Sequence, residues 1–436
     1  MNLFWKKLFG KFQSTARFEQ DEEDTLASMH RYDEVEQSAA LAEYRKLFHI
    51  VKSAQFQENK EIMQNRRYRD TEESRSCRKV EKLQKNAAIR KYYETADSEP
   101  LELFLSFKDS PEYELLGDRR QVKKSHELKN FKKFEHSKEY KNYVRFHNSY
   151  VIKELEELQN KVTTPEFQMA NDFWKNPKRW ETTPEYEQEQ HFYSLEKSPD
   201  IEFFNNETPE RFKKYRERTL TFSQEFSPES FSSFWTAGFH YVSQQLIGNH
   251  SFANEKAANN NGKNTVVENG VLKIFTRSEN VKAPAWDIKK GFIEKDFYFT
   301  SDIITTADNF TQECGIFQAK IRFTGKIHHA FWLGADGKLP HINIFHFNGK
   351  KITVGNASKE KIDGTAITGI SRLSPFVYTL VWKKNELVWY INNIEVFRTA
   401  HVPKEELYLA FNSFISNKQK GSAGCLEVDW IRVYKI

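Results

Sequence analysis

The chain has 436 residues, enough for two to four domains of roughly 100 to 200 residues each. Residues 1–220 hold 41 Lys and Arg, 41 Asp and Glu and two glycines, so the net charge of +5 and the other 15 glycines belong to residues 221–436. Because opposite charges are balanced in the first part, it lacks the one-sign stripe of a nucleic-acid-binding surface. Cys77, Cys314 and Cys425 are too few and too scattered for a disulfide framework or a zinc cluster, which favours a reducing compartment.

Residues 1–19 predict a short amphipathic arm. Lys6 and Lys7 interrupt the apolar stretch that a secretory signal needs, and no later stretch approaches the roughly 18 apolar residues of a membrane span. We therefore expect no export by the general secretory route and a location in the cytoplasm or inside a particle. Two interpretations of the arm stay open: a helix on a membrane surface and, preferred because one short helix binds membranes weakly, an arm docked on protein. Its apolar side chains are Leu3, Phe4, Trp5, Leu8, Phe9 and Phe12.

Residues 20–219 predict an array of short α-helices, since they are poor in glycine and rich in Glu, Lys, Gln, Leu and Ala. A pattern recurs there: Ser or Thr, two residues that usually include Pro or Glu, then in most copies an apolar residue. A hydroxyl caps free amides, Pro fits the first turn and an acid suits the positive helix end, so each copy predicts a helix start. The spacing is too irregular for a solenoid of one period, and a partner-binding scaffold and an ordinary helical domain remain equal alternatives. The predicted starts are Ser110, Ser125, Ser137, Thr164, Thr183, Ser198 and Thr208.

From about residue 220 the chain changes to short runs of Phe, Val, Ile, Thr and Tyr separated by Asn, Gly, Ser and Asp. Runs such as 315–323, 376–382 and 426–434 predict strands, and their spacing favours an antiparallel jelly-roll sandwich. The pair Asn392-Asn393 predicts a tight hairpin, because Asn tolerates positive φ. The predicted fold class is therefore α + β multidomain, with the arm and the helical array followed by an antiparallel β-sandwich at 220–436.

Six blocks of the second part follow one another in an order typical of a known family. They are 222–226 with Trp235, 300–306, 315–320, 330–334, 378–393 and 428–434. On these blocks, residues 220–436 resemble glycoside hydrolase family 16, the laminarinase and lichenase group with a concanavalin A-like fold. The resemblance implies a catalytic strand directly after the block at 330–334.

In the family that strand carries Glu-x-Asp-x-x-Glu, with the first Glu as nucleophile, the Asp as support and the last Glu as general acid/base. The matching positions here are His341, Asn343 and His346. Strand alternation puts the first two on one face, and the extra residue before the third needs a bulge to restore its facing. Retaining hydrolysis needs two carboxyls about 5–5.5 Å apart, and neutral imidazole does not reproduce the glycosyl ester. The replacements predict that the domain is not an enzyme and has no catalytic residues.

Metal binding is considered at two places. His328, His329, His341 and His346 fall on two strands expected to be neighbours, but no carboxylate or thiolate accompanies them, so a structural role is favoured over zinc or copper. The family resemblance also implies a calcium ion held partly by the Asp of the closing strand, which is Asp429 here. Because calcium needs six or more oxygens, a buried Asp that accepts from backbone amides is the preferred alternative. No other cofactor is expected.

The resemblance further implies that aromatic side chains form platforms for sugars. The glycan-binding candidates are Trp286, predicted in a loop at 282–286, together with Trp332, His329, His341 and His346. The leading hypothesis is a non-catalytic structural or assembly subunit of a large complex, for example a phage particle, with protein partners and a hydrolase-like domain for docking or adhesion. A glycan-binding module that has lost hydrolysis is the first alternative, with a polysaccharide as partner, and a hydrolase with a histidine mechanism is the second. Nucleic acid and a transmembrane segment are not expected. An open cleft lined by aromatic residues would favour the glycan-binding module.

Overall fold

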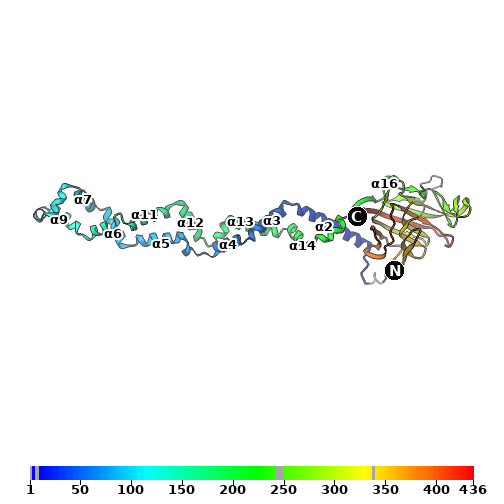
Figure 1. Ribbon diagram of the computed structural model, residues 1–436, viewed down its shortest axis with the longest axis horizontal. Coiled ribbons are helices and arrows are strands. Elements are labelled where there is room, and N and C mark those ends of the chain that lie inside the picture. The colour runs from blue at the N-terminus through cyan, green and yellow to red at the C-terminus, as the bar shows by residue number, and fades with distance from the viewer. Residues whose placement is uncertain (1, 5–8, 242–248, 336–338) are drawn as a thin grey trace. The chain divides into compact units, whose positions relative to one another are not determined.

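The computed structural model describes residues 2–4, 9–241, 249–335 and 339–436 (Figure 1). The chain divides into a helical unit, Asp33–Glu207, and a sandwich unit that joins Met1–Tyr32 with Thr208–Ile436. Each unit has its own hydrophobic core. The predicted fold class, short helices followed by an antiparallel sandwich, is confirmed. Over the described ranges, no helix is long and apolar enough to cross a membrane.

Short helices make up the helical unit, and most start at a capping side chain. Ser125, Ser137, Thr164, Thr183 and Ser198 each accept a hydrogen bond from a backbone amide three residues on, which confirms these predicted starts. Ser110 and Thr208 instead precede 3-10 helices and make no side-chain cap bond. The elements are α3 (Ala39–Val51), α4 (Ala54–Asn65), η1 (Tyr68–Asp70), α5 (Glu72–Gln84), α6 (Ala87–Ala96), α7 (Glu99–Lys108), η2 (Pro111–Gly117), α8 (Arg119–Lys124), α9 (His126–Glu135), α10 (Lys138–Phe146), α11 (Tyr150–Thr163), α12 (Pro165–Lys175), η3 (Arg179–Thr182), α13 (Pro184–Glu196) and α14 (Pro199–Asn206).

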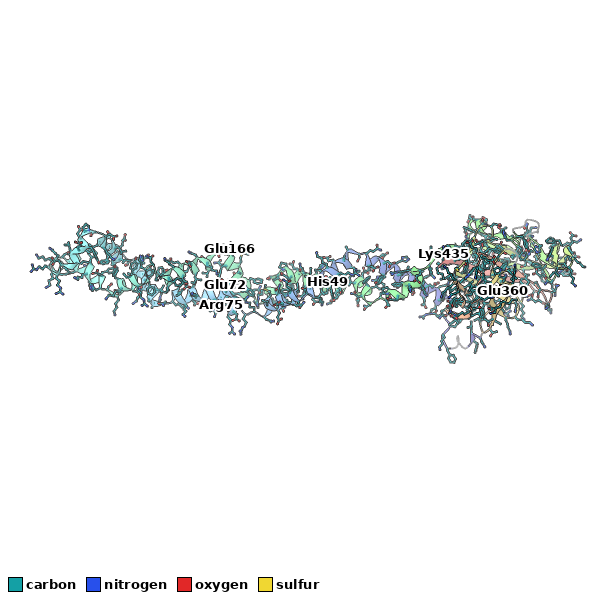
Figure 2. All side chains as sticks on the ribbon, in the orientation of Figure 1. His49, Glu72, Arg75, Glu166, Glu360 and Lys435 are labelled. Atoms are coloured by element: carbon teal, nitrogen blue, oxygen red, sulfur yellow. The ribbon has the colours of Figure 1, made fainter. Side chains whose placement is uncertain are left out.

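The helices of this unit form two runs that lie side by side (Figure 1). The run from α3 to α7 is matched by the returning run from α9 to α14, with α3 against α13, α5 against α11 and α6 against α10. Aromatic pairs join the runs: Tyr44 stacks on Phe192 with ring centroids 5.4 Å apart, and Tyr92 stacks on Tyr143 at 5.6 Å. Figure 2 shows the charged side chain of Glu72 on α5, whose carboxylate lies 2.5 Å from Lys161 Nζ on α11. The balanced charges of the sequence thus include ion pairs between the two runs.

The sandwich unit contains two β-sheets. One has the strand order β17-β16-β15-β10-β19-β6-β7-β4, with β1, β3 and β5 at its side, and the other has the order β14-β13-β12-β11-β18-β8-β2, with β9 beside β18. All pairings are antiparallel except β3 with β6 and β4 with β7, among the strands described. The elements are α2 (Thr15–Glu36), η4 (Pro209–Phe212), α15 (Lys213–Arg216), β1 (Thr219–Gln224), α16 (Pro228–Phe234), β2 (Thr236–Ala237), β3 (Ser251–Phe252), β4 (Ala257–Asn259), β5 (Thr265–Glu268), β6 (Val271–Asp287), β7 (Gly291–Ser301), β8 (Ile303–Thr305), β9 (Thr311–Gln312), β10 (Gly315–Thr324), β11 (His328–Gly334), β12 (His341–Asn348), β13 (Ile352–Ala357), β14 (Ile362–Ile367), β15 (Phe376–Trp382), β16 (Leu387–Ile391), β17 (Ile394–Thr399), β18 (Leu407–Phe414) and β19 (Gly424–Lys435).

The sandwich core receives side chains from both sheets. Phe317 of β10 and Trp382 of β15 belong to the same buried cluster as Phe331 of β11 and Phe411 of β18. Asn392 has a φ of 49°, as predicted for the turn between β16 and β17. Because successive strand residues alternate between faces, the neighbours of Phe331 and Phe411 face away from this core. That outer face of β11, β12 and β18 carries the candidate site.

The N-terminal segment packs on the sandwich. Leu3 and Phe12 are buried in the sandwich core, and the Leu3 amide donates to the Thr368 carbonyl at 2.8 Å. Phe4 and Phe9 are exposed, and the predicted arm residues Trp5 and Leu8 lie outside the described residues. These contacts are of the kind expected for an arm docked on protein.

Candidate functional site

The three positions of the altered catalytic motif lie on β12 and share one face. Ile342, Ile344, Phe345 and Phe347 of this strand belong to the core, whereas His341, Asn343 and His346 are half-buried. Phe331 and Trp332 of β11 pair with Phe345 and Asn343, so Ile344 is an extra residue in β12. This irregularity is the predicted bulge, and it returns His346 to the face of His341 and Asn343.

A pocket of about 280 Å³ lies over this face. Two neighbouring strands complete its floor, since β11 pairs with both β12 and β18. The side chains that line the pocket are mostly aromatic or uncharged. They are Phe239, His240, Tyr241, Phe252, Glu255, Ala330, Trp332, His341, Asn343, His346, Tyr408, Asn412 and Phe414.

Trp332 is held in place from three sides. Its indole Nε1 donates to Asn412 Oδ1 on β18 at 3.0 Å. Its ring stacks on His341, with centroids 4.6 Å apart and planes inclined by 24°, and meets Tyr408 edge-on at 5.9 Å. A satisfied indole N–H and packed neighbours fix the ring in one orientation, which is what a stacking platform requires.

A second group of stacked rings surrounds His346. His328 Nδ1 and His346 Nε2 share a hydrogen bond of 3.0 Å, and the His328 ring stacks on Phe414 at 4.2 Å. Burial lowers the pKa of His328 to about 4, and burial together with the neighbouring histidines lowers the pKa of His346 to about 4. Both imidazoles are therefore neutral at physiological pH, so each can donate one hydrogen bond and accept another.

His341 is also uncharged at neutral pH. Burial lowers its pKa, although its hydrogen bond to Asn343 opposes the shift. His341 Nε2 donates to Asn343 Oδ1 at 3.1 Å, and the Asn343 carbonyl accepts from Trp389 Nε1 at 2.9 Å. Among the described residues that line the pocket, Glu255 is the sole carboxylate, and none is Lys or Arg. The site is thus a nearly uncharged aromatic pocket with amide and imidazole groups.

The structure brings together three of the five glycan-binding candidates. Trp332, His341 and His346 line the pocket, whereas His329 is fully buried on the opposite face of β11, bonded to Ser413 Oγ and the Thr324 carbonyl at 2.8 Å each. Trp286 lies outside the pocket and packs edge-on against Phe292 at 5.0 Å. Its predicted loop position is wrong, because β6 continues through Pro284 to Asp287. Proline is tolerated where a strand does not need its amide.

Several pocket residues were not predicted from the sequence. Tyr408, Asn412 and Phe414 alternate along β18 with the core residues Leu409 and Phe411, so strand alternation is a signal that identifies them. Glu255 carries no such signal, because it lies outside the regular strands. The Glu255 backbone carbonyl and that of Ala253 accept from Lys295 Nζ, which fixes this part of the rim.

Asp429 occupies a different environment from the one that calcium needs. Its carboxylate lies 2.8 Å from Lys320 Nζ, and the same ammonium lies 3.0 Å from Glu19. Glu225, whose carboxylate could supply a further oxygen, is paired with Arg432 at 2.8 Å. The described residues contain no group of three or more His, Cys, Asp or Glu side chains arranged to hold a metal ion. Calcium at Asp429 stays a prediction.

Solved structures of family 16 catalytic domains are similar to this chain. No protein-family model and no curated protein matches the sequence. The laminarinase catalytic domain from Thermotoga maritima MSB8 is 20% identical, with a TM-score of 0.40 over 50% of this chain and 99% of that one. An endo-β-1,3-glucanase from Pyrococcus furiosus is 20% identical, with a TM-score of 0.41 over 50% and 94%. The κ-carrageenase from Pseudoalteromonas carrageenovora is 17% identical, with a TM-score of 0.39 over 50% and 95%. Each of these matches covers half of this chain at low identity.

Proposed function

We propose that the sandwich unit binds a glycan through an uncharged stretch of sugars and does not hydrolyse it. The observation that carries the proposal is the aromatic pocket lined by Trp332, with neutral His341, Asn343 and His346 beside it. Sugars present apolar C–H faces to aromatic rings and hydroxyls to amide and imidazole groups. The pocket offers both kinds of partner on one rigid sheet face.

The described residues that line this pocket do not include the pair of carboxyls that glycoside hydrolysis uses. Both stereochemical routes need two carboxyls, one as acid and one as base or nucleophile. The described lining residues supply one carboxylate, Glu255. The neutral histidines can hold or pass a proton but do not form the glycosyl ester of a retaining enzyme. Binding without turnover is the outcome that this set of side chains favours.

Binding and hydrolysis are tested separately on the full chain. A glycan array followed by calorimetry with laminarin, lichenan, agarose and carrageenan oligosaccharides measures binding. We expect Trp332→Ala to weaken binding of the best ligand about tenfold or more, because one aromatic platform contributes roughly 1–3 kcal/mol. Trp286→Ala is the matched control, since it removes an indole of the same domain outside the pocket. Equal affinity of the Trp332→Ala and Trp286→Ala variants for the ligand would contradict the proposal. So would hydrolysis by the unmodified chain that disappears in a His341→Ala, His346→Ala protein.

For the helical unit we propose a role in assembly with a protein partner. The observation in favour is a set of exposed apolar side chains on these helices, among them Leu103, Val144, Tyr150 and Met169, of which the last two are each 75% exposed. Mass spectrometry of proteins that co-purify with the untagged chain from its own host should find a stoichiometric partner. A Tyr150→Ser, Met169→Ser protein should lose that partner and remain folded. Isolation of the native chain as a stable, partner-free monomer would contradict this role.

A further inference from the structure

A second cavity, of about 820 Å³, lies at one end of the strands that form the aromatic pocket. It is built by three turns, namely the turn before β11, the turn after β12 and the segment after β18, together with Arg372 from the loop between β14 and β15. Its cations are Lys326, Lys350, Arg372, Lys418 and Lys420, and none of the described residues that line it is acidic. We refer to it as the basic cavity.

The five cations are available to a ligand. All of them are exposed, and within the described part of the chain none of them forms an ion pair. Elsewhere on the same unit, surface cations are commonly paired, as Arg322 is with Glu427 and Arg432 with Glu225. Arg372 lies over the ring of Phe347, 5.7 Å from its centroid. Five like charges around one hollow repel one another, and a bound anion relieves that repulsion.

The backbone around the basic cavity is held by specific hydrogen bonds. Gln419 Nε2 donates to the carbonyls of Lys326 and Asn348 at 3.3 Å, and Gln419 Oε1 accepts from the Ser416 amide at 3.0 Å. Gly349 has a φ of +88°, and a Cβ there would lie 2.3 Å from Gln419 Nε2. One side chain thus ties the three turns together, which places their lysines before any ligand arrives.

The basic cavity and the aromatic pocket are built on the same strands. Asn348, which lines the basic cavity, follows His346 by two residues on β12, a distance of roughly 7 Å along a strand. His328 and Phe414 stack beside His346, and the cavity residues Lys326 and Lys418 lie two residues before the first and four after the second. A linear ligand seated on Trp332 therefore reaches the basic cavity when it runs toward this end of the strands.

We propose that the bound glycan carries anionic substituents and that the basic cavity binds them while the aromatic pocket holds neighbouring uncharged sugars. This inference rests on the proposed glycan binding. The position of the charges sets the direction of the chain, because the five cations at this end of the strands attract its anionic substituents. A glycan is favoured over nucleic acid since the cations gather in one hollow and do not form a stripe along a surface.

The test uses ligands with one backbone and different charge. Laminarin, laminarin sulfate and laminarin oxidised to carry carboxylates, all of matched length, are titrated into the full chain at low and high salt. We expect laminarin sulfate or the carboxylated form to bind on the order of tenfold more tightly than laminarin at low salt, with the advantage reduced by salt. Whichever of these two charged forms gains more affinity relative to laminarin identifies the anion as sulfate or carboxylate.

Two variants with the same change in charge locate the effect. Lys350→Gln, Lys418→Gln, Lys420→Gln should remove the advantage of the charged ligands and leave laminarin binding unchanged. Lys289→Gln, Lys290→Gln, Lys404→Gln changes exposed lysines away from the cavity and should keep the advantage. Three results would overturn the inference: equal affinity for neutral and charged laminarin, an equal loss in both variants, or tighter binding of single-stranded DNA than of either charged laminarin. None of these three results contradicts the proposed function. That proposal fails separately if Trp332→Ala leaves laminarin binding unchanged.

Discussion

His329 is a buried histidine whose protonation links stability to pH. Burial lowers its pKa to about 4, whereas in the unfolded chain the group has an ordinary pKa of about 6.5. Between these values the unfolded chain binds a proton that the folded chain does not, so stability is lost as pH falls from about 6.5 to about 4. His328 and His346, with pKa values lowered to about 4, act in the same direction.

We predict that the sandwich unit loses up to about 3 kcal/mol per such buried histidine across this window. His329→Gln should reduce the pH dependence, because an amide does not titrate there and keeps both a donor and an acceptor for Ser413 and Thr324. Denaturant unfolding at several pH values measures how the free energy of unfolding changes with pH. His30→Gln, an exposed histidine on α2, is the control and should keep the native slope. A free energy of unfolding of the unmodified protein that stays constant between about pH 6.5 and about pH 4 would refute the prediction.

At the residue scale the sequence predicted one side of the pocket. Strand alternation and the bulge gave the common facing of His341, Asn343 and His346 on β12. The other side comes from β18 and from segments near β3, and their position depends on strand order across the sheet. Local alternation contains no information on that order. His329 was misjudged for a related reason, because a histidine next to a pocket residue on the same strand faces the opposite side.

At the element scale, one hydroxyl commonly joins two successive helices of the helical unit. Thr71 Oγ1 donates to the Tyr68 carbonyl at 2.8 Å and accepts from the Ser74 amide at 3.2 Å. Thr183 does the same with Trp180 and Tyr186, at 2.7 and 3.2 Å. Each such hydroxyl caps an amide left free after it and adds a second hydrogen bond to a carbonyl that already accepts from the backbone amide of the same residue, so the chain can bend there with both groups bonded.

We predict that Thr71→Ala destabilises the helical unit by about 1–2 kcal/mol, because it leaves the buried Ser74 amide without the hydroxyl that caps it. Thr71→Ser retains the hydroxyl and should cost much less. Urea unfolding followed by the circular dichroism of the helices compares the two. Equal destabilisation by Ala and Ser would assign the effect to the lost methyl group instead.

The irregular spacing of the predicted helix starts has a structural explanation. The sequence pattern depended on Pro and acids, so it missed caps that lack them, such as Ser38, Ser53 and Ser149. With Ser38, Ser53, Thr71, Asn86 and Ser98 the outgoing intervals are 15, 18, 15 and 12 residues. From Ser137 through Ser149, Thr164 and Thr183 to Ser198 the returning intervals are 12, 15, 19 and 15. The intervals of the returning run are nearly those of the outgoing run in reverse order. Helices that pair across the two runs therefore have similar lengths and stay in register.

At the scale of the whole molecule, two separate cores and one set of buried histidines give the units different responses to acid. The cores of the helical unit are built from residues such as Phe104 and Phe192, whereas the sandwich core contains Phe317 and Phe411. The histidines whose pKa is lowered by burial, among the described residues, all belong to the sandwich. Acid should therefore weaken the sandwich through these groups.

We predict two calorimetric transitions whose separation changes between about pH 7 and about pH 5, because the sandwich transition moves to lower temperature through its histidines. The transitions are assigned with variants introduced above: Thr71→Ala should lower only the helical transition, and His329→Gln should make the sandwich transition less sensitive to pH. Deuterium exchange near each midpoint gives an independent assignment, since the opened unit loses its protection first. A single transition that both variants shift together would show instead that the two cores unfold as one cooperative unit.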